Sequence, residues 1–203
     1  MFLTLEGIEG SGKSTLVRSM HERLALAGGE PLLTREPGGT PVGIAVRDLL
    51  LRSRLDVTPL TEALLMNASR AQLVSEKIKP TLDAGRDVLC DRFADSTLAY
   101  QGYGRGLDLP TLRLLCLAAT GGLEPDLTLL LDLPVDRLPE RLADKAGLED
   151  RFEVEDAAFH ERVRRGYLEM AKSAGRWHVL DATLAPEALL DAAWDVVQSH
   201  RAS

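Results

Sequence analysis

The sequence predicts an α/β fold in which a central sheet of five parallel strands is flanked by helices. Short apolar or β-branched runs alternate with helical patterns along the chain, and this alternation is typical of a parallel sheet with helical crossovers. One run, residues 127–131 (LTLLL), is apolar at nearly every position, as expected for a strand that is covered on both faces. A glycine-rich turn between the first apolar run and the first helical pattern is a further feature, and it indicates which kind of α/β fold is present.

The first half of the chain supplies three expected strands and three expected helices. The strands are residues 1–5, 31–34 and 87–90. Apolar residues at helical spacing predict helices over residues 14–26, 41–51 and 58–82. Thr58-Pro59 supports the start of the third helix, because threonine is a favourable N-cap and proline is favourable as the first helical residue.

The second half continues the alternation. The expected helices are residues 109–119, 134–143, 155–174 and 186–199, and the expected strands are 127–131 and 177–180. Residues 95–105 are rich in glycine, which predicts an irregular segment. Residues 144–153 form a charged stretch between two helices, and we expect a short mobile lid there. No linker or repeat is visible, so residues 1–203 are expected to form a single domain.

Composition excludes several classes of protein. The chain has 203 residues and a formal net charge of −7, with 24 Lys and Arg against 31 Asp and Glu. Binding to a nucleic-acid backbone needs a basic surface, so no nucleic-acid partner is expected. No apolar run approaches the roughly 18 residues of a membrane span, the first residues do not resemble a secretory signal, and two cysteines are too few for a disulfide framework. We therefore expect a soluble, cytoplasmic protein without a membrane partner.

A phosphate-binding loop follows the first expected strand. Residues 7–14 (GIEGSGKS) fit G-x-x-x-x-G-K-[ST] between a strand and a helix. Glycines let backbone N–H groups wrap a phosphate, and the helix N-terminus adds positive potential. Lys13 is expected to reach the β- and γ-phosphates and the Ser14 hydroxyl to ligate Mg²⁺. The expected fold is therefore a three-layer P-loop NTPase sandwich that binds a nucleoside triphosphate with magnesium.

Charged side chains are expected at the same edge of the sheet. Asp91 ends a strand, where ligands of open α/β sheets bind, and it either holds a magnesium-bound water or caps a turn. Four arginines follow strands or lie on the intervening helices: Arg35, Arg47, Arg70 and Arg92. Each alone is an ordinary surface residue, but together they could bind a second phosphate-bearing ligand. A phosphate acceptor is already largely a dianion at neutral pH, so such a reaction needs no general base.

Other classes of protein share the phosphate loop. A guanine-nucleotide switch needs an Asn-Lys-x-Asp segment after a later strand, and the chain has none. A kinase for another nucleotide or for a nucleoside stays open, and a nucleoside acceptor would need a base, for which Glu9 is the candidate. A nucleotide-dependent switch or an inactive paralogue, acting as a binding module, also stays open.

Several segments together resemble the bacterial thymidylate kinase family. They are residues 6–15 (EGIEGSGKST), 34–40 (TREPGGT), 91–96 (DRFADS), 99–102 (AYQG) and 150–153 (DRFE). The resemblance runs from Met1 to about Tyr167 and more weakly to the end. It implies a homodimeric enzyme that phosphorylates dTMP to dTDP with ATP and magnesium, in dTTP synthesis.

The resemblance also implies sets of site residues. The catalytic set would be Lys13, Arg92 and Glu9, with Arg151 or Lys145 from the lid. The ATP-binding set would be Gly7, Ile8, Glu9, Gly10, Ser11, Gly12, Lys13, Ser14 and Thr15. Ser14 and Asp91 would hold the metal. The dTMP-binding set would be Glu9, Arg35, Pro37, Arg47, Met66, Arg70, Arg92, Ser96, Tyr100 and Gln101.

Within the dTMP set, the resemblance divides the work between phosphate, sugar and base. Arg92 and Arg47 would contact the 5′-phosphate, and Arg35 begins the loop around it. Glu9 would approach the 3′-hydroxyl. Tyr100 would pack under the sugar and disfavour a 2′-hydroxyl.

For the base, Arg70 would stack on or hydrogen-bond thymine, with Gln101 and Ser96 as polar partners. Pro37 matches a proline that the family holds in a cis peptide bond. The family usually places a phenylalanine against the ring where this chain has Met66. That methionine either packs on thymine through its thioether or fills the core of its helix.

The lid departs from the family pattern. Family members with glycine at position 10 usually supply a catalytic arginine from the lid, but residues 144–149 (DKAGLE) contain only Lys145 as a cation. Arg141 and Arg151 flank this stretch. One of the three is expected to stabilise the transition state, and Arg151 and Lys145 are favoured.

The remaining reactive side chains are expected to be structural. The four histidines lack partners at metal-ligand spacing and are expected at the surface or at an interface: His21, His160, His178 and His200. Cys90 is expected to be buried and inert.

Overall fold

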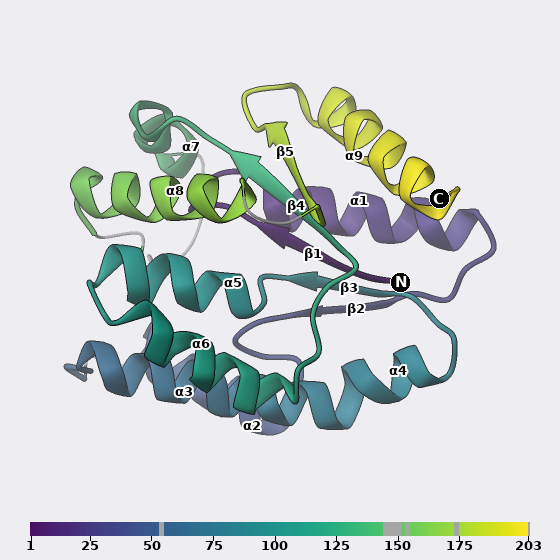
Figure 1. Ribbon diagram of the computed structural model, residues 1–203. Helices are drawn as coiled ribbons and strands as arrows, with labels where there is room; N and C mark the ends of the chain where they lie inside the picture. Colours follow the sequence, from purple (N-terminus) through teal and green to yellow (C-terminus); the bar gives the residue numbers. More distant parts are fainter. Residues whose placement is uncertain (53–54, 144–151, 153–154, 173–174, 203) are drawn as a thin grey trace.

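The computed structural model contains one sheet of five parallel strands, in the order β2-β3-β1-β4-β5, with helices on both faces (Figure 1). The strands are β1 (Phe2–Glu6), β2 (Leu32–Arg35), β3 (Val88–Asp91), β4 (Leu127–Asp132) and β5 (Trp177–Asp181). The structure describes residues 1–52, 55–143, 152, 155–172 and 175–202. The predicted fold class is confirmed, and each strand lies within about one residue of its predicted range.

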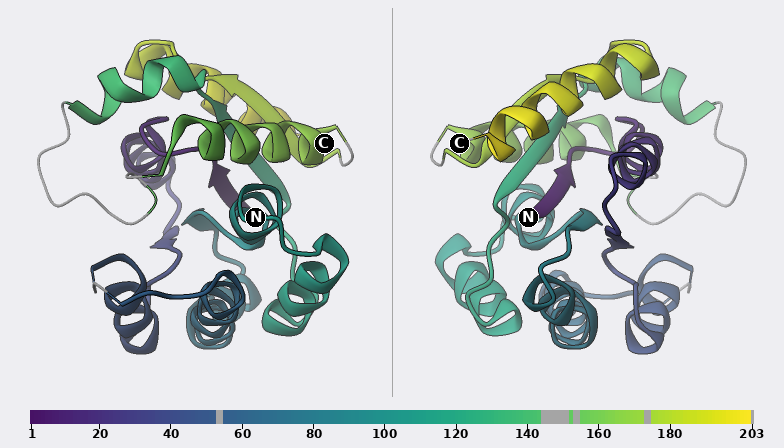
Figure 2. Two further views of the ribbon diagram at one scale, coloured as in Figure 1. Left: turned by 90° about the vertical axis from the view of Figure 1, so that its left-hand side faces the viewer. Right: turned by 90° about the vertical axis from the view of Figure 1, so that its right-hand side faces the viewer.

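Three long helices cover the part of the sheet formed by the central and last strands. α1 (Lys13–Leu26) and α9 (Pro186–Arg201) pack side by side on one face. α8 (Ala157–Ala171) lies on the other face, against β4 and β5 (Figure 2).

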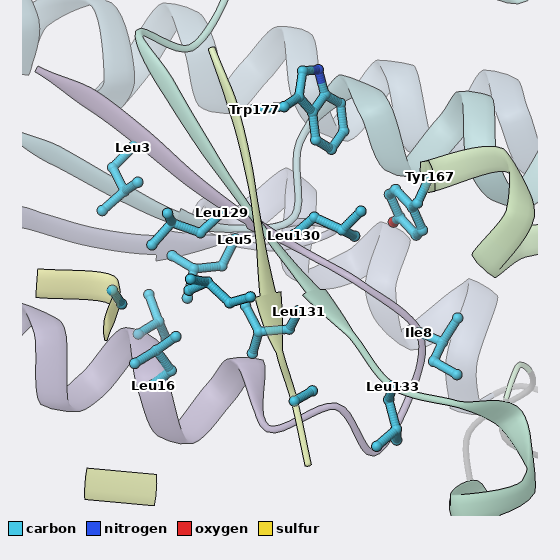
Figure 3. Close-up of a cluster of buried hydrophobic side chains, with 14 of the residues drawn as sticks. Leu3, Leu5, Ile8, Leu16, Leu129, Leu130, Leu131, Leu133, Tyr167 and Trp177 are labelled. Carbon is cyan, nitrogen blue, oxygen red and sulfur yellow. The ribbon is translucent and has the colours of Figure 1, made fainter. Parts of the chain in front are cut away.

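Side chains of β4 pack alternately into the two helical layers. Figure 3 shows Leu129 and Leu131 on the side of Leu16 in α1, and Leu130 on the side of Tyr167 in α8. All five side chains are buried. Burial on both faces explains why this strand is almost continuously apolar.

The other helices are α2 (Pro41–Arg47), α3 (Pro59–Leu73), α4 (Lys79–Asp83), α5 (Ala94–Thr97), α6 (Leu109–Thr120) and α7 (Leu138–Ala143). Wider π-helical turns follow α2, α3 and α5 at Asp48–Arg52, Val74–Ile78 and Leu98–Gly104, and a 3₁₀ turn, Val135–Arg137, precedes α7. Because α3, its π-helical turn and α4 follow one another without a break, the long helix predicted over residues 58–82 is confirmed.

The segment predicted to be irregular, residues 95–105, is instead almost entirely helical. α5 and the π-helical turn after it run through to Gly104. Its glycines permit close packing. A Cβ on Gly104 would lie 2.7 Å from the ring of Phe159, and one on Gly102 would clash with Leu109. These glycines let neighbouring helices approach closely. The composition of the segment alone instead predicts that they interrupt the helix.

The ends of three strands meet at one edge of the sheet. Asp91 of β3 lies beside both Leu5 of β1 and Arg35 of β2 in the register, so the loops that follow these strands come together. The lid predicted at residues 144–153 falls outside the described residues except for Phe152. Among the described helices, none is both long and apolar enough to cross a membrane.

Candidate active site

A cavity of about 440 Å³ opens at this edge. Its lining includes all ten residues predicted for dTMP: Glu9, Arg35, Pro37, Arg47, Met66, Arg70, Arg92, Ser96, Tyr100 and Gln101. From the predicted ATP-binding set, Glu9, Gly10, Gly12, Lys13, Ser14 and Thr15 line it too. Gly7, Ile8 and Ser11 are buried in the loop. One cavity therefore brings the two predicted nucleotide sites together.

Lys13 is held by the phosphate loop itself. Its Nζ donates to the carbonyl oxygens of Gly7 at 2.9 Å and Ile8 at 2.7 Å, and to Ser11 Oγ at 3.2 Å. Burial, followed by the charge of Arg92, lowers the pKa of Lys13 to about 8, against the opposing effect of nearby carboxylates. A phosphate in the loop would offer this ammonium a charged partner in place of neutral carbonyls.

Ser14 and Asp91 lie together at the cavity wall. The Ser14 hydroxyl donates to Asp91 Oδ2 at 2.9 Å, which joins the first turn of α1 to the end of β3. Among the described residues, no three or more His, Cys, Asp or Glu side chains lie close enough together to hold a metal ion. A hydroxyl and one carboxylate nevertheless fit magnesium, which usually completes its shell with phosphate oxygens and water.

Arg92 is the most highly connected side chain at the phosphate side of the cavity. It follows β3 with φ of 72°, the one positive φ of a non-glycine residue in the described chain. Its guanidinium donates to Gly7 O at 2.9 Å, Tyr167 Oη at 3.2 Å, Tyr100 Oη at 2.9 Å and Glu9 Oε1 at 2.7 Å. Strained backbone conformations persist where the surroundings fix them, and these contacts fix Arg92 beside the phosphate loop.

Glu9 places a buried carboxylate in the same wall. The Tyr100 hydroxyl lies 2.7 and 2.8 Å from its two oxygens. Burial raises the pKa of Glu9, but Arg92, Lys13 and the Tyr100 hydrogen bond outweigh burial and hold it below the usual value. Glu9 is therefore a carboxylate at neutral pH, able to accept a hydrogen bond from a ligand hydroxyl.

A second carboxyl group, Glu6, supports this arrangement from beneath. Its Oε1 accepts the Phe93 N–H at 2.8 Å, and its Oε2 accepts the hydroxyls of Ser96 at 2.6 Å and Tyr167 at 2.8 Å. Burial, followed by the charge of Asp95, raises the pKa of Glu6 to about 7. Glu6 thereby ties the end of β1 to the turn that carries Arg92.

Arg70 is fully engaged with the protein. Nε donates to Glu36 Oε2 at 2.8 Å, Nη1 to Asn67 Oδ1 at 2.8 Å and to Thr97 Oγ1 at 3.0 Å, and Nη2 to Phe93 O at 3.0 Å, with Glu36 also 2.8 Å from Nη2. All five N–H groups thus have protein partners. Of the two predicted modes, stacking against a base leaves these bonds in place, whereas hydrogen bonding to a base would displace one of them.

The polar side chains predicted near the base are also paired. Gln101 Nε2 donates to Glu62 Oε1 at 2.8 Å. The Ser96 hydroxyl donates its hydrogen bond to Glu6, so it can only accept a hydrogen bond from a ligand. Met66 is half-buried in the cavity wall.

The rim carries further cations. Arg47 donates to the carbonyl of Pro37 at 3.1 Å, Arg35 is exposed, and Arg141 lines the cavity while donating to Ala182 O at 3.0 Å. The Glu36–Pro37 bond is cis, as the resemblance implied. The other two candidate lid cations, Lys145 and Arg151, lie outside the described residues.

The phosphate loop and the helix that leads toward the lid touch at Gly10. This residue has φ of 68°. A Cβ built on it would lie 3.0 Å from Cβ of Arg141 and 3.2 Å from Cδ1 of Leu138. Helix α7 therefore packs directly against the backbone of the phosphate loop at Gly10.

Sequence reasoning missed several residues of the site. Glu36, Thr97, Leu51 and Phe152 line the cavity. Burial, opposed by Arg70, raises the pKa of Glu36 to about 7. His160, predicted at the surface or an interface, is 1% exposed, with Nδ1 3.6 Å from Glu9 Oε2. Its position on the apolar face of α8, next to Phe159, was the available signal.

Comparison with known proteins gives consistent matches. The family model for thymidylate kinase matches residues 5–193. Thymidylate kinase of Desulfovibrio desulfuricans is 54% identical over 195 residues, covering 92% of this chain and 90% of that protein. Thymidylate kinase of Deinococcus radiodurans is 50% identical over 201 residues, covering 98% and 97%.

A solved structure agrees with both the fold and the family. The crystal structure of thymidylate kinase from Ehrlichia chaffeensis superimposes with a TM-score of 0.82 at 34% identity, and the match covers 98% of each chain. Since the family match, the close relatives and this structure all span almost the whole chain, the protein belongs to the thymidylate kinase family, whose activity is the phosphorylation of dTMP to dTDP.

Proposed function

We propose that this chain transfers the γ-phosphoryl group of ATP to dTMP in the cavity described above, giving ADP and dTDP. The observation that carries the proposal is that one cavity is lined both by the phosphate-loop lysine and by three arginines at its acceptor side: Arg35, Arg47 and Arg92. Two phosphate groups repel each other unless cations lie between and around them, and this lining supplies those cations.

ATP occupies the phosphate loop, residues 7–15. Lys13 exchanges the carbonyls of Gly7 and Ile8 for the β- and γ-phosphates. Ser14 and Asp91, which are already in contact, would hold Mg²⁺. The ion would supply positive charge to neutralise the phosphates of ATP.

The phosphate and sugar of dTMP lie beside Arg92 and Glu9. Arg92 and Arg47 bind the 5′-phosphate, with Arg35 at the rim. Glu9 accepts a hydrogen bond from the 3′-hydroxyl. The ring of Tyr100, edge-on to Phe152 at 5.1 Å between centroids, packs under the sugar, where it would disfavour a 2′-hydroxyl.

Thymine lies between Met66 and the face of the Arg70 guanidinium, near Gln101. Stacking is the mode that the paired N–H groups of Arg70 support. The hydroxyl of Ser96 donates its hydrogen bond to Glu6, so its oxygen suits the N3–H donor of thymine, whereas cytosine offers only an acceptor at N3.

In the transfer, an oxygen of the dTMP phosphate attacks the γ-phosphorus in line. A new O–P bond forms as the bond to the β,γ-bridging oxygen breaks, and ADP leaves with that electron pair. The dianionic acceptor needs no general base. Lys13, Arg92 and one cation among Arg141, Lys145 and Arg151 act by neutralising charge.

We also propose a homodimer and a cytoplasmic location. The adjacent helices α3 and α6 expose large apolar side chains, namely Leu60, Leu64, Leu114 and Leu117, and such a patch supports a protein interface. The two cysteines, Cys90 and Cys116, are both free thiols, in keeping with a reducing compartment.

The test is steady-state formation of ADP from ATP and Mg²⁺ with dTMP, dUMP, dCMP, UMP or dGMP as acceptor. We expect the fastest turnover with dTMP and loss of turnover when magnesium is chelated. Equal ADP formation without any acceptor would contradict the kinase proposal. Preference for another monophosphate would retain phosphoryl transfer and overturn the thymine site.

A further inference from the structure

A buried histidine lies behind the sugar end of the cavity. His160 of α8 is 1% exposed, and neither of its ring nitrogens has a hydrogen-bond partner among the described residues. Buried polar groups nearly always have partners because leaving them unpaired costs free energy. An imidazole left in this state next to a site therefore calls for an explanation.

The charged group beside this imidazole is Glu9. Nδ1 of His160 lies 3.6 Å from Glu9 Oε2, just beyond the roughly 2.7–3.2 Å of an N–H···O hydrogen bond. The ring also packs edge-on against Phe159, with 5.7 Å between centroids. The imidazole nitrogen thus lies close to the carboxylate without yet bonding it.

One of the donors that now hold Glu9 is needed by the substrate. Arg92 donates to Glu9 Oε1 at 2.7 Å, and Tyr100 lies against both carboxylate oxygens. Under the proposed function, on which this inference rests, Arg92 must also bind the acceptor phosphate. A phosphate dianion competes strongly for a guanidinium, so Glu9 stands to lose its charged donor when dTMP binds.

We propose that His160 is a positioning residue, which becomes a hydrogen-bond donor to Glu9 when Arg92 turns to the acceptor phosphate. An approach of about 0.5 Å brings the two atoms within hydrogen-bond distance. The exchange keeps a buried carboxylate paired and in place for the sugar hydroxyl. Recognition of the phosphate and of the sugar are thereby coupled through one imidazole.

The experiment compares binding of dTMP and thymidine to the full-length protein by calorimetric titration. Thymidine has the same base and sugar but no phosphate, so Arg92 stays with Glu9. His160→Leu keeps an apolar side chain and removes the donor, whereas His160→Gln keeps an N–H donor. We expect His160→Leu to weaken dTMP binding about tenfold or more, to leave thymidine binding nearly unchanged, and His160→Gln to restore most of the dTMP affinity.

A second arm uses Glu9→Gln, which removes the carboxylate that His160 is proposed to hold. In that background His160→Leu should cause little further loss of dTMP affinity, and in each background the KM for ATP should be the same with His160 as with Leu at this position. Should His160→Leu fold poorly, His160→Met provides the same comparison with His160→Gln.

The outcomes separate this inference from the proposed function. Equal losses for thymidine and dTMP would assign His160 to packing and overturn the exchange. Unchanged dTMP affinity in His160→Leu would overturn it as well. A wild-type protein that binds neither ligand would instead overturn the proposed function.

Discussion

Two regions of the same cavity hold an arginine in different ways. At the phosphate side, Arg92 pairs with Glu9, and both side chains line the cavity. At the base side, Arg70 is 1% exposed and directs every N–H at protein groups, two of them at Glu36. Arg70 and Glu36 line the cavity too, but the N–H groups of Arg70 are all used to join α3 to its neighbours, which leaves only the face of the guanidinium for a base.

Because of this difference, we expect the Arg92–Glu9 pair to matter mainly for catalysis and the Arg70–Glu36 pair mainly for folding stability. A pair at the ligand surface can exchange partners when substrate binds, so its loss affects catalysis. A pair whose hydrogen bonds join structural elements has no such exchange, and removing one member leaves the other buried without its charged partner. Substitutions in the two regions should therefore have opposite signatures.

The largest expected effect is on turnover at the phosphate side. Arg92→Ala should lower kcat by about 10³-fold or more, the range seen when an arginine that stabilises phosphoryl transfer is removed. ATP binding should be nearly intact, because Lys13 and the loop backbone stay in place. Steady-state ADP formation and an ATP titration measure the two quantities. Unchanged turnover would exclude this arginine from the transfer.

Next in size is a loss of stability at the base side. Arg70→Met should lower the free energy of unfolding by about 3–5 kcal/mol near pH 8, since it leaves the buried Glu36 carboxyl group without its charged partner. Urea unfolding measures it, with Arg92→Ala as the comparison, for which a smaller loss is expected because Lys13 and the Tyr100 hydroxyl still stabilise Glu9. If both variants unfold at the same urea concentration, the two regions do not differ as described.

The smallest expected effect concerns pH. The pKa of Glu36 is about 7 in the folded chain against an ordinary value of 4.5, so between these pH values the folded protein keeps a proton that the unfolded chain releases. Its contribution to the free energy of unfolding therefore falls as pH rises through this window, by roughly 2–3 kcal/mol.

Glu36→Gln cannot ionise and should flatten this fall between pH 5 and pH 8, measured by urea unfolding at each pH. The slope should not vanish, because the pKa of Glu6 is also raised to about 7. Glu22→Gln, at an exposed position, is the control and should leave the slope unchanged. A variant of Glu36 with the wild-type slope would show that this carboxyl group ionises normally.

Much of the fold and site could be predicted because the signals are local. Residues 7–14 carry their own strand–loop–helix context, and Asp91 and Arg92 follow an apolar run directly. These residues sit where the chain leaves a strand, and parallel strands bring their ends to one edge. The residues directly before and after each of these positions were therefore enough to predict that they belong to the site.

The rest depends on contacts between distant segments. Gly102 and Gly104 read as helix breakers until the packing of Phe159 and Leu109 against them is known. The contacts of Glu36 and His160 at the site are with Arg70 and Glu9, which lie far away in sequence. Composition describes neither kind of contact.

The seat of α7 on Gly10 also bears on how such enzymes diverge. The resemblance implies relatives that carry an arginine at this loop position in place of a lid arginine. Here a single substitution of Gly10 would meet Leu138 and Arg141 on the facing helix, in a backbone conformation that disfavours side chains. A side chain at this loop position therefore needs a small shift of the facing helix, so we expect loop and helix to change together when one arrangement replaces the other.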